Sequence, residues 1–167
     1  MVTRTEGDTY TPMISEIFTK VNNAKDKPAK IEVLMTYDCQ PLRQILKGAF
    51  DPTIKWDLPE GTPPYKENDA PAGTEHTTLH QEAQRLYNFV LGANDNISKT
   101  RKETLFIQVL EGLHKDEARA FIAVKDNRLN LVFKGLTEQL VKEAYDWTDD
   151  FVIKPKPLTN RDVIESV

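Results

Sequence analysis

Residues 11–50 read TPMISEIFTKVNNAKDKPAKIEVLMTYDCQPLRQILKGAF, and this stretch decides the fold class. It contains three combinations of a capping residue with an early proline, at Thr11-Pro12, at Asp26 with Pro28, and at Cys39 with Pro41. Such combinations are typical of helix starts, because proline lacks the N–H group that would be unpaired in the first turn. Apolar residues follow each start at helical spacing. The stretch therefore predicts three short helices joined by tight turns.

Helical spacing returns after residue 76 and predicts further helices at 77–91, 98–112, 115–125 and 137–147. Residues 129–133 are ambiguous, because leucine, valine and phenylalanine cluster there without helical spacing, and a strand is the alternative. Taken together, the pattern predicts an all-α fold. We expect a single compact multi-helix domain of about six or seven short helices.

Residues 51–76 interrupt this pattern. They hold five of the ten prolines and show no periodicity. A stretch of this length without periodicity inside a domain is usually functional or mobile. We expect a flexible N-terminus at 1–10 and a helical domain at 11–147 that contains this long Pro-rich loop. An extended tail is expected at 148–167, because two prolines prevent a helix there.

The composition excludes several classes of protein. Hydrophobic residues make up 39% and charged residues 29%, which predicts a packed core rather than global disorder. No apolar run approaches the roughly 18 residues of a membrane span, and the polar N-terminus does not resemble a signal peptide. We therefore expect a cytoplasmic protein without a membrane partner. The single cysteine, Cys39, excludes an internal disulfide, and with no histidine near it in sequence it is predicted to be unreactive.

Two patterns with chemical meaning have ordinary explanations. His76 and His80 stand four residues apart at a helix start, as two metal ligands can, and Glu75 and Glu82 lie nearby. A further ligand is not evident, so we interpret both histidines as solvated. Residues 55–57, Lys-Trp-Asp, match part of a Lys-x-Asp-Gly motif of nucleotide-transferring enzymes, but Leu58 replaces the glycine. The sequence therefore predicts no catalytic residue, no metal and no cofactor, and we expect no enzyme.

Residues 98–134 form the locally basic part of a chain whose formal net charge is −4. They contain eight cations and five acids, a local net charge of 8 − 5 = +3. Basic residues and a hydroxyl or glycine gather at two expected helix starts, where backbone N–H groups and the helix dipole favour phosphate. Ordinary solvated charge is the alternative. The candidate residues for nucleic-acid binding are Lys99, Arg101, Lys102, Lys125, Arg128, Lys134, Gly135 and Thr137.

Residues 110–147, LEGLHKDEARAFIAVKDNRLNLVFKGLTEQLVKEAYDW, carry a resemblance to a known family. They resemble the end of the all-helical N-terminal DNA-binding domain of the ATP-dependent DNA ligases of tailed phages. Lys125-Asp126 stands at that domain's basic–Asp pair, Gly135 at its loop glycine, Thr137 at its hydroxyl and Trp147 near its closing aromatic. Lys134 departs from the pattern by replacing a cysteine, and the loop before Gly135 is longer.

The resemblance extends over residues 13–147, and the chain also resembles small uncharacterised tailed-phage proteins. It implies a non-catalytic phage accessory protein that binds double-stranded DNA in replication or transcription, in the host cell cytoplasm, without the ligase's catalytic domain. The alternative is a protein-interaction or virion structural protein on the same fold, which binds a phage or host protein instead. For that alternative the acidic-aromatic tail offers Asp150, Phe151 and Ile153 as partner-binding residues. A continuous positive face joining the Lys99 and Lys134 helix ends would favour DNA.

Overall fold

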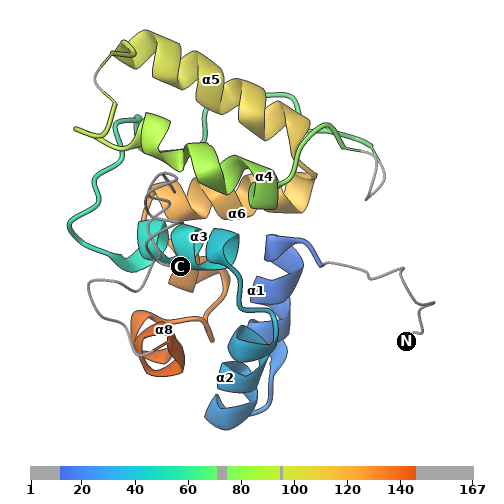
Figure 1. Ribbon diagram of the computed structural model, residues 1–167. Coiled ribbons are helices and arrows are strands. Elements are labelled where there is room, and N and C mark those ends of the chain that lie inside the picture. Colours follow the sequence, from blue (N-terminus) through green and yellow to red (C-terminus); the bar gives the residue numbers. More distant parts are fainter. Residues whose placement is uncertain (1–11, 71–74, 95, 146–167) are drawn as a thin grey trace, which may run out of the picture.

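The computed structural model describes residues 12–70, 75–94 and 96–145, and all regular structure in these ranges is helical (Figure 1). An isolated bridge between Trp56 and Val90 is the nearest approach to a sheet within them. None of the described helices is both long and apolar enough to cross a membrane. The predicted all-α class is confirmed. The described elements are α1 (Ile14–Asn23), α2 (Lys27–Thr36), α3 (Gln40–Phe50), α4 (Leu79–Glu82), the 3₁₀ helix η1 (Ala83–Phe89), α5 (Lys99–Gly112), α6 (Lys115–Lys125), α7 (Leu129–Val132) and α8 (Glu138–Tyr145).

Local capping explains most of the helix starts. Asp26 caps α2 by accepting a hydrogen bond from the Ala29 N–H at 3.0 Å, and Ser98 caps α5 through the Arg101 N–H at 3.1 Å. Helix α1 begins later than the Thr11-Pro12 signal predicts. Its N-cap is Met13, whose N–H donates to the Glu16 carboxylate at 2.8 Å. The Glu16 carboxylate therefore serves as a capping group at the start of α1.

Two segments differ from the sequence prediction. The helix expected at 77–91 is an α-helical turn, α4, that continues as the 3₁₀ helix η1. The end of η1 and the residues after it pair with the Pro-rich loop. The Asp57 N–H donates to Phe89 O at 2.7 Å, and the Leu91 N–H donates to Lys55 O at 2.8 Å. The strand considered as the alternative for residues 129–133 is not formed. Those residues form the single helical turn α7, in which the Arg128 carbonyl accepts from Leu131 N–H at 2.9 Å.

Helix α6 is the centre of the domain. It packs against α1 and α3 on one side and α5 on another, and nearly all of its residues from Glu117 onward are buried. Figure 1 shows α5 and α4 above α6, with α1, α2 and α8 below it. Phe121 anchors an aromatic cluster in which it contacts Trp56, Phe89 and Phe106 at ring-centroid distances of 5.0–6.3 Å. Such edge-to-face pairs add about 1 kcal/mol each to the burial of the rings.

Glu117 is a buried acid at this centre. Its carboxylate accepts hydrogen bonds from the Ile14 N–H at 2.8 Å and the Leu79 N–H at 3.0 Å, which are the first residues of α1 and α4. One side chain of α6 thus caps two other helices. Burial raises the pKa of Glu117, and these backbone donors oppose that rise by stabilising the ionised form.

Candidate functional site

Residues 51–70, called the strap here, are the described part of the Pro-rich segment, and charged side chains fasten them to α5 and α6. The innermost contact joins Lys102 of α5 to Asp57, with Nζ and Oδ2 2.8 Å apart. Both side chains are buried, with exposed fractions of 1% and 8%. The hydrogen bond from Lys102 lowers the pKa of Asp57, and Lys99 adds a longer ion pair at 3.3 Å. Lys102 is therefore an interior residue and offers no charge to a phosphate at the surface.

The Lys125 side chain, at the end of α6, binds the main chain of the strap. Its ammonium group donates to the carbonyls of Pro59 at 2.8 Å and Gly61 at 3.0 Å, and to the Asp126 carboxylate at 2.5 Å. Asp126 in turn accepts from the Gly61 N–H at 3.2 Å. The Lys125 side chain is 1% exposed. Lys125 and Asp126 thus close this strap contact together.

Exposed ion pairs continue along the outer face of α6 and just beyond its end. Arg128 contacts Glu60 at 2.9 Å, and Arg119 contacts Glu67 at 2.8 Å. The Lys66 N–H donates to Glu111 at 2.9 Å, so the strap stays attached well beyond its prolines. Exposed ion pairs contribute about 0–1 kcal/mol each, so the interior contacts dominate the attachment. Their effect here is to neutralise Arg119 of α6 and Arg128, which follows that helix.

The remaining nucleic-acid candidates lie at two separate helix starts. Arg101 and Lys134 are exposed and have no acidic partner among the described residues. The Gly135 N–H donates to Asn22 at 2.7 Å, and the Thr137 hydroxyl caps α8 by accepting from the Leu140 N–H at 3.2 Å. Figure 1 shows α5 and α8 at opposite ends of the fold, with α6 and α3 between them. The structure therefore does not join these two helix starts into one positive face.

The other predicted residues divide as follows. Asp150, Phe151 and Ile153 lie outside the described residues, as does Trp147. His76 is exposed, whereas His80 is half-buried and hydrogen-bonds Pro12 O at 3.1 Å, so the interpretation of His80 as solvated is wrong. Across the described ranges, no group of three or more histidine, cysteine or acidic side chains is placed to hold a metal ion.

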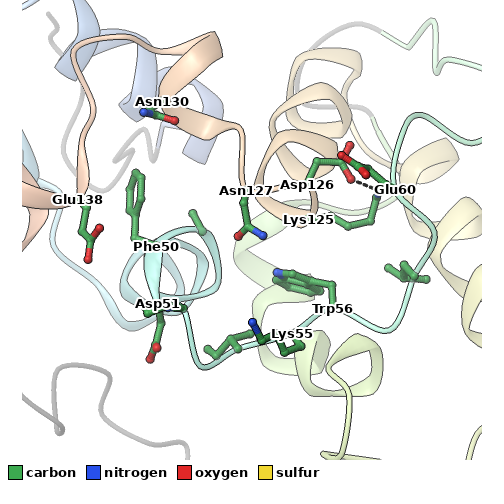
Figure 2. Close-up of a pocket in the computed structure, with 14 residues that line it drawn as sticks. Phe50, Asp51, Lys55, Trp56, Glu60, Lys125, Asp126, Asn127, Asn130 and Glu138 are labelled. Carbon is green, nitrogen blue, oxygen red and sulfur yellow. Dashed lines mark hydrogen bonds and ion pairs between the residues drawn. The ribbon is translucent and has the colours of Figure 1, made fainter.

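A cleft of about 680 Å³ lies between α3, the strap and the segment that follows α6 (Figure 2). We call it the acidic cleft, because four carboxylates and two ammonium groups line it. Its lining residues are Ala49, Phe50, Asp51, Pro52, Ile54, Lys55, Trp56, Leu58, Glu60, Lys125, Asp126, Asn127, Asn130 and Glu138. The sequence marks this region only through the strap, since the walls other than the end of α3 come from residues 125–138, far along the chain.

Aromatic and acidic side chains meet in the acidic cleft. The Trp56 indole N–H donates to the Gly48 carbonyl at 3.1 Å, which fixes the ring. Figure 2 shows Asp51 and Glu138 close to Phe50, on one side of the cleft, with Lys125 and Asp126 beyond Trp56. Burial raises the pKa of Asp51, but hydrogen bonds from Thr53 and the nearby Lys47 outweigh it and lower the pKa overall. Asp51 is therefore charged at neutral pH.

This arrangement can bind a cation. Indole rings and carboxylates are the groups that hold ammonium and guanidinium ions in proteins. Lys125 faces the strap carbonyls and does not compete for the open part of the cleft. Lys55 is the other cation of the lining and is exposed.

Comparison with known proteins adds one finding. Residues 17–131 match the model of a family described as "Family of unknown function (DUF6433)". These residues include the strap, α6 and most of the acidic cleft. Neither a curated protein nor a solved structure matches the chain. The chain belongs to the DUF6433 family.

Proposed function

We propose that this protein is a non-catalytic interaction module whose acidic cleft takes a basic segment of a protein partner. The observation that carries the proposal is the lining of the cleft, which combines four carboxylates with a fixed indole. A lysine or arginine placed over Trp56 would gain about 0.5–2 kcal/mol from the ring, depending on how far it is desolvated. Asp51 and Glu138 would supply the opposite charge at the rim.

The same geometry gives less support to DNA binding. Lys102 and Lys125 are interior, and Lys99 and Arg128 are paired with acids of the strap. Protein–DNA affinity comes largely from lysine and arginine contacts to phosphate. The carboxylates of the cleft are paired as well, with Lys47, Lys125, Arg128 and Lys142. What favours a protein partner is the fixed indole of Trp56, which the two helix starts lack. The resemblance to phage proteins suggests that the partner belongs to a phage or host replication or transcription machinery, or to a virion.

Fluorescence of Trp56 tests the proposal directly. A Trp147→Phe background leaves Trp56 as the single tryptophan, since the chain has two. The ligands are a Gly/Ser peptide that carries arginines and the same peptide with citrulline, a neutral isostere. We expect a saturable change with the arginine peptide and none with the citrulline peptide. The double variant Asp51→Asn/Glu138→Gln should abolish it, whereas Glu32→Gln on the exposed face of α2 should not.

Equal responses to the two peptides, or a response that survives the double variant, would overturn the proposal. The DNA-binding alternative retains one favourable observation: Arg101 and Lys134, at two helix starts, have no acidic partner within residues 12–70, 75–94 and 96–145. A gel shift with nicked and intact duplex at low salt tests it. Binding that falls steeply with salt and disappears in Arg101→Gln/Lys134→Gln would assign the protein to DNA instead.

A further inference from the structure

The strap forms one rung of an antiparallel ladder with the chain that follows η1. The two hydrogen bonds of this ladder are made by Lys55 O and the Asp57 N–H. Trp56 lies between them and faces Val90 as a pair that exchanges no hydrogen bond of its own. In such a ladder the backbone groups of successive residues point to opposite edges. The N–H and C=O groups of Trp56 therefore point away from Val90, to the outer edge of the strap.

The outer edge of the strap borders the acidic cleft and has no backbone partner. By the same alternation it comprises the Ile54 carbonyl, the N–H and carbonyl of Trp56, and the Leu58 N–H. None of these four groups makes a hydrogen bond within residues 12–70, 75–94 and 96–145. Ile54, Trp56 and Leu58 all line the acidic cleft. An unpaired backbone edge beside a cleft is the feature onto which an extended peptide adds as a further strand.

The side chains around this edge suit a strand with alternating charge. In an extended segment every second side chain lies on one face, and neighbours on that face are about 7 Å apart. Figure 2 shows Asp51 and Glu138 on one side of the Trp56 ring and Glu60 on another. The ion pairs of Glu60 and Glu138 are exposed, so exchanging them for ion pairs with a partner costs little. A guanidinium over the indole would thus have neighbours, two positions away, that can meet carboxylates.

We propose that the partner segment binds as an added β-strand along residues 54–58 and carries a basic residue at every second position. The added strand deepens the proposed function, on which it rests, by giving the conformation and the spacing of the segment that the acidic cleft takes. Its backbone pairs with the outer edge of the strap. Its alternate side chains reach Trp56 and the carboxylates, while those between them point away from the indole.

N-methylated peptides distinguish this mode from binding by side chains alone. The parent peptide alternates arginine and serine. One derivative carries N-methyl groups on the arginine nitrogens, and the other carries them on the serine nitrogens. In an added strand only one of these two sets of N–H groups points toward the strap, where Ile54 O and Trp56 O accept hydrogen bonds. Both derivatives have the same charge and the same number of methyl groups, so each is the matched control of the other.

Affinities are measured by Trp56 fluorescence in the full-length Trp147→Phe protein. We expect one derivative to bind at least about tenfold more weakly than the other, because it lacks the donors for two carbonyls of the strap. A weakened arginine-methylated peptide assigns an antiparallel strand, and a weakened serine-methylated peptide assigns a parallel one. A peptide of the same composition with its arginines in one block should bind severalfold more weakly than the parent, since only alternate arginines face the cleft.

Amide hydrogen exchange in the ¹⁵N-labelled full-length protein gives a second readout. The parent peptide should slow exchange at the Trp56 and Leu58 N–H groups severalfold. The Asp57 and Leu91 N–H groups are the internal controls and should change less, because each already donates to a carbonyl of the ladder.

Three outcomes would contradict the added strand. Equal affinities of the two methylated derivatives, or unchanged exchange at Trp56 and Leu58 in the bound protein, overturn it and leave the proposed function standing, provided that the parent binds and its citrulline counterpart does not. Equal binding of the blocked and alternating peptides overturns the spacing of basic residues. If the parent peptide does not bind, the added strand and the proposed function fall together.

Discussion

The Glu117 carboxylate of α6 accepts the Ile14 N–H of α1 at 2.8 Å, across 103 positions of sequence. Its other oxygen accepts the Leu79 N–H. In Glu117→Gln one of these N–H groups faces an NH₂ donor, and a buried donor left unpaired costs about 1–3 kcal/mol. We expect a loss of that size in the free energy of unfolding by urea. Glu32→Gln on the exposed surface of α2 should change it by less than about 0.5 kcal/mol.

The buried pair of Asp57 and Lys102 predicts a pH dependence. The pKa of Asp57 is lowered in the folded protein, so its contribution is present above its unfolded value and is lost as the pH falls through its folded value. Asp57→Asn should cost about 3 kcal/mol at pH 7, because it leaves the Lys102 ammonium without its partner. Urea unfolding of both proteins from pH 7 down to pH 2 measures this. The difference in free energy of unfolding between the wild-type protein and Asp57→Asn should become smaller as the pH falls. A difference that does not depend on pH would contradict the ion pair.

Lys125 and Arg128 offer a comparison of two strap contacts. Lys125→Met removes the donor to the Pro59 and Gly61 carbonyls and leaves Asp126 without its buried partner, so we expect a loss of about 3 kcal/mol and rapid proteolysis within the strap. Arg128→Gln breaks an exposed pair with Glu60 and should cost less than about 1 kcal/mol. Limited proteolysis with mass spectrometry reports the cleavage sites. Equal protection in the two variants would show that the interior contact does not hold the strap.

Gly48 sets the position of Trp56. A Cβ at Gly48 would lie 2.8 Å from Trp56 Cζ2, so Gly48→Ala must displace the indole ring. We expect a cost of about 1–3 kcal/mol, as for other overpacked sites, together with a shifted Trp56 emission in the Trp147→Phe background. Gly112→Ala in α5 is the milder comparison, because its new Cβ would lie 3.2 Å from Thr77 Cγ2. Unchanged emission in Gly48→Ala would contradict the close approach.

Local signals explain which parts of the fold could be predicted. The caps Asp26 and Ser98 act on N–H groups three residues away, so the starts of α2 and α5 follow from neighbouring residues. The same reasoning fails for 77–91, because the end of that helix depends on pairing with Lys55 and Asp57 of the strap. Long-range contacts of this kind leave no periodic pattern.

The candidate sites were harder to predict for a related reason. Lys102 and Lys125 look like solvated cations in the sequence, and only their tertiary partners make them interior. The sequence did contain an indication of these partners, since the strap carries acids at Asp57, Glu60 and Glu67 that can neutralise a basic helix.

Lys125 recognises the strap through main-chain oxygens, and this has a consequence for natural variation in the family. Any residue at position 59 presents the same carbonyl to the lysine, so that side chain is free to vary among relatives. Gly61 is less free, because its φ of +96° is a conformation that other residues rarely adopt. Selection should therefore preserve Lys125 and Gly61 while Pro59 is exchanged.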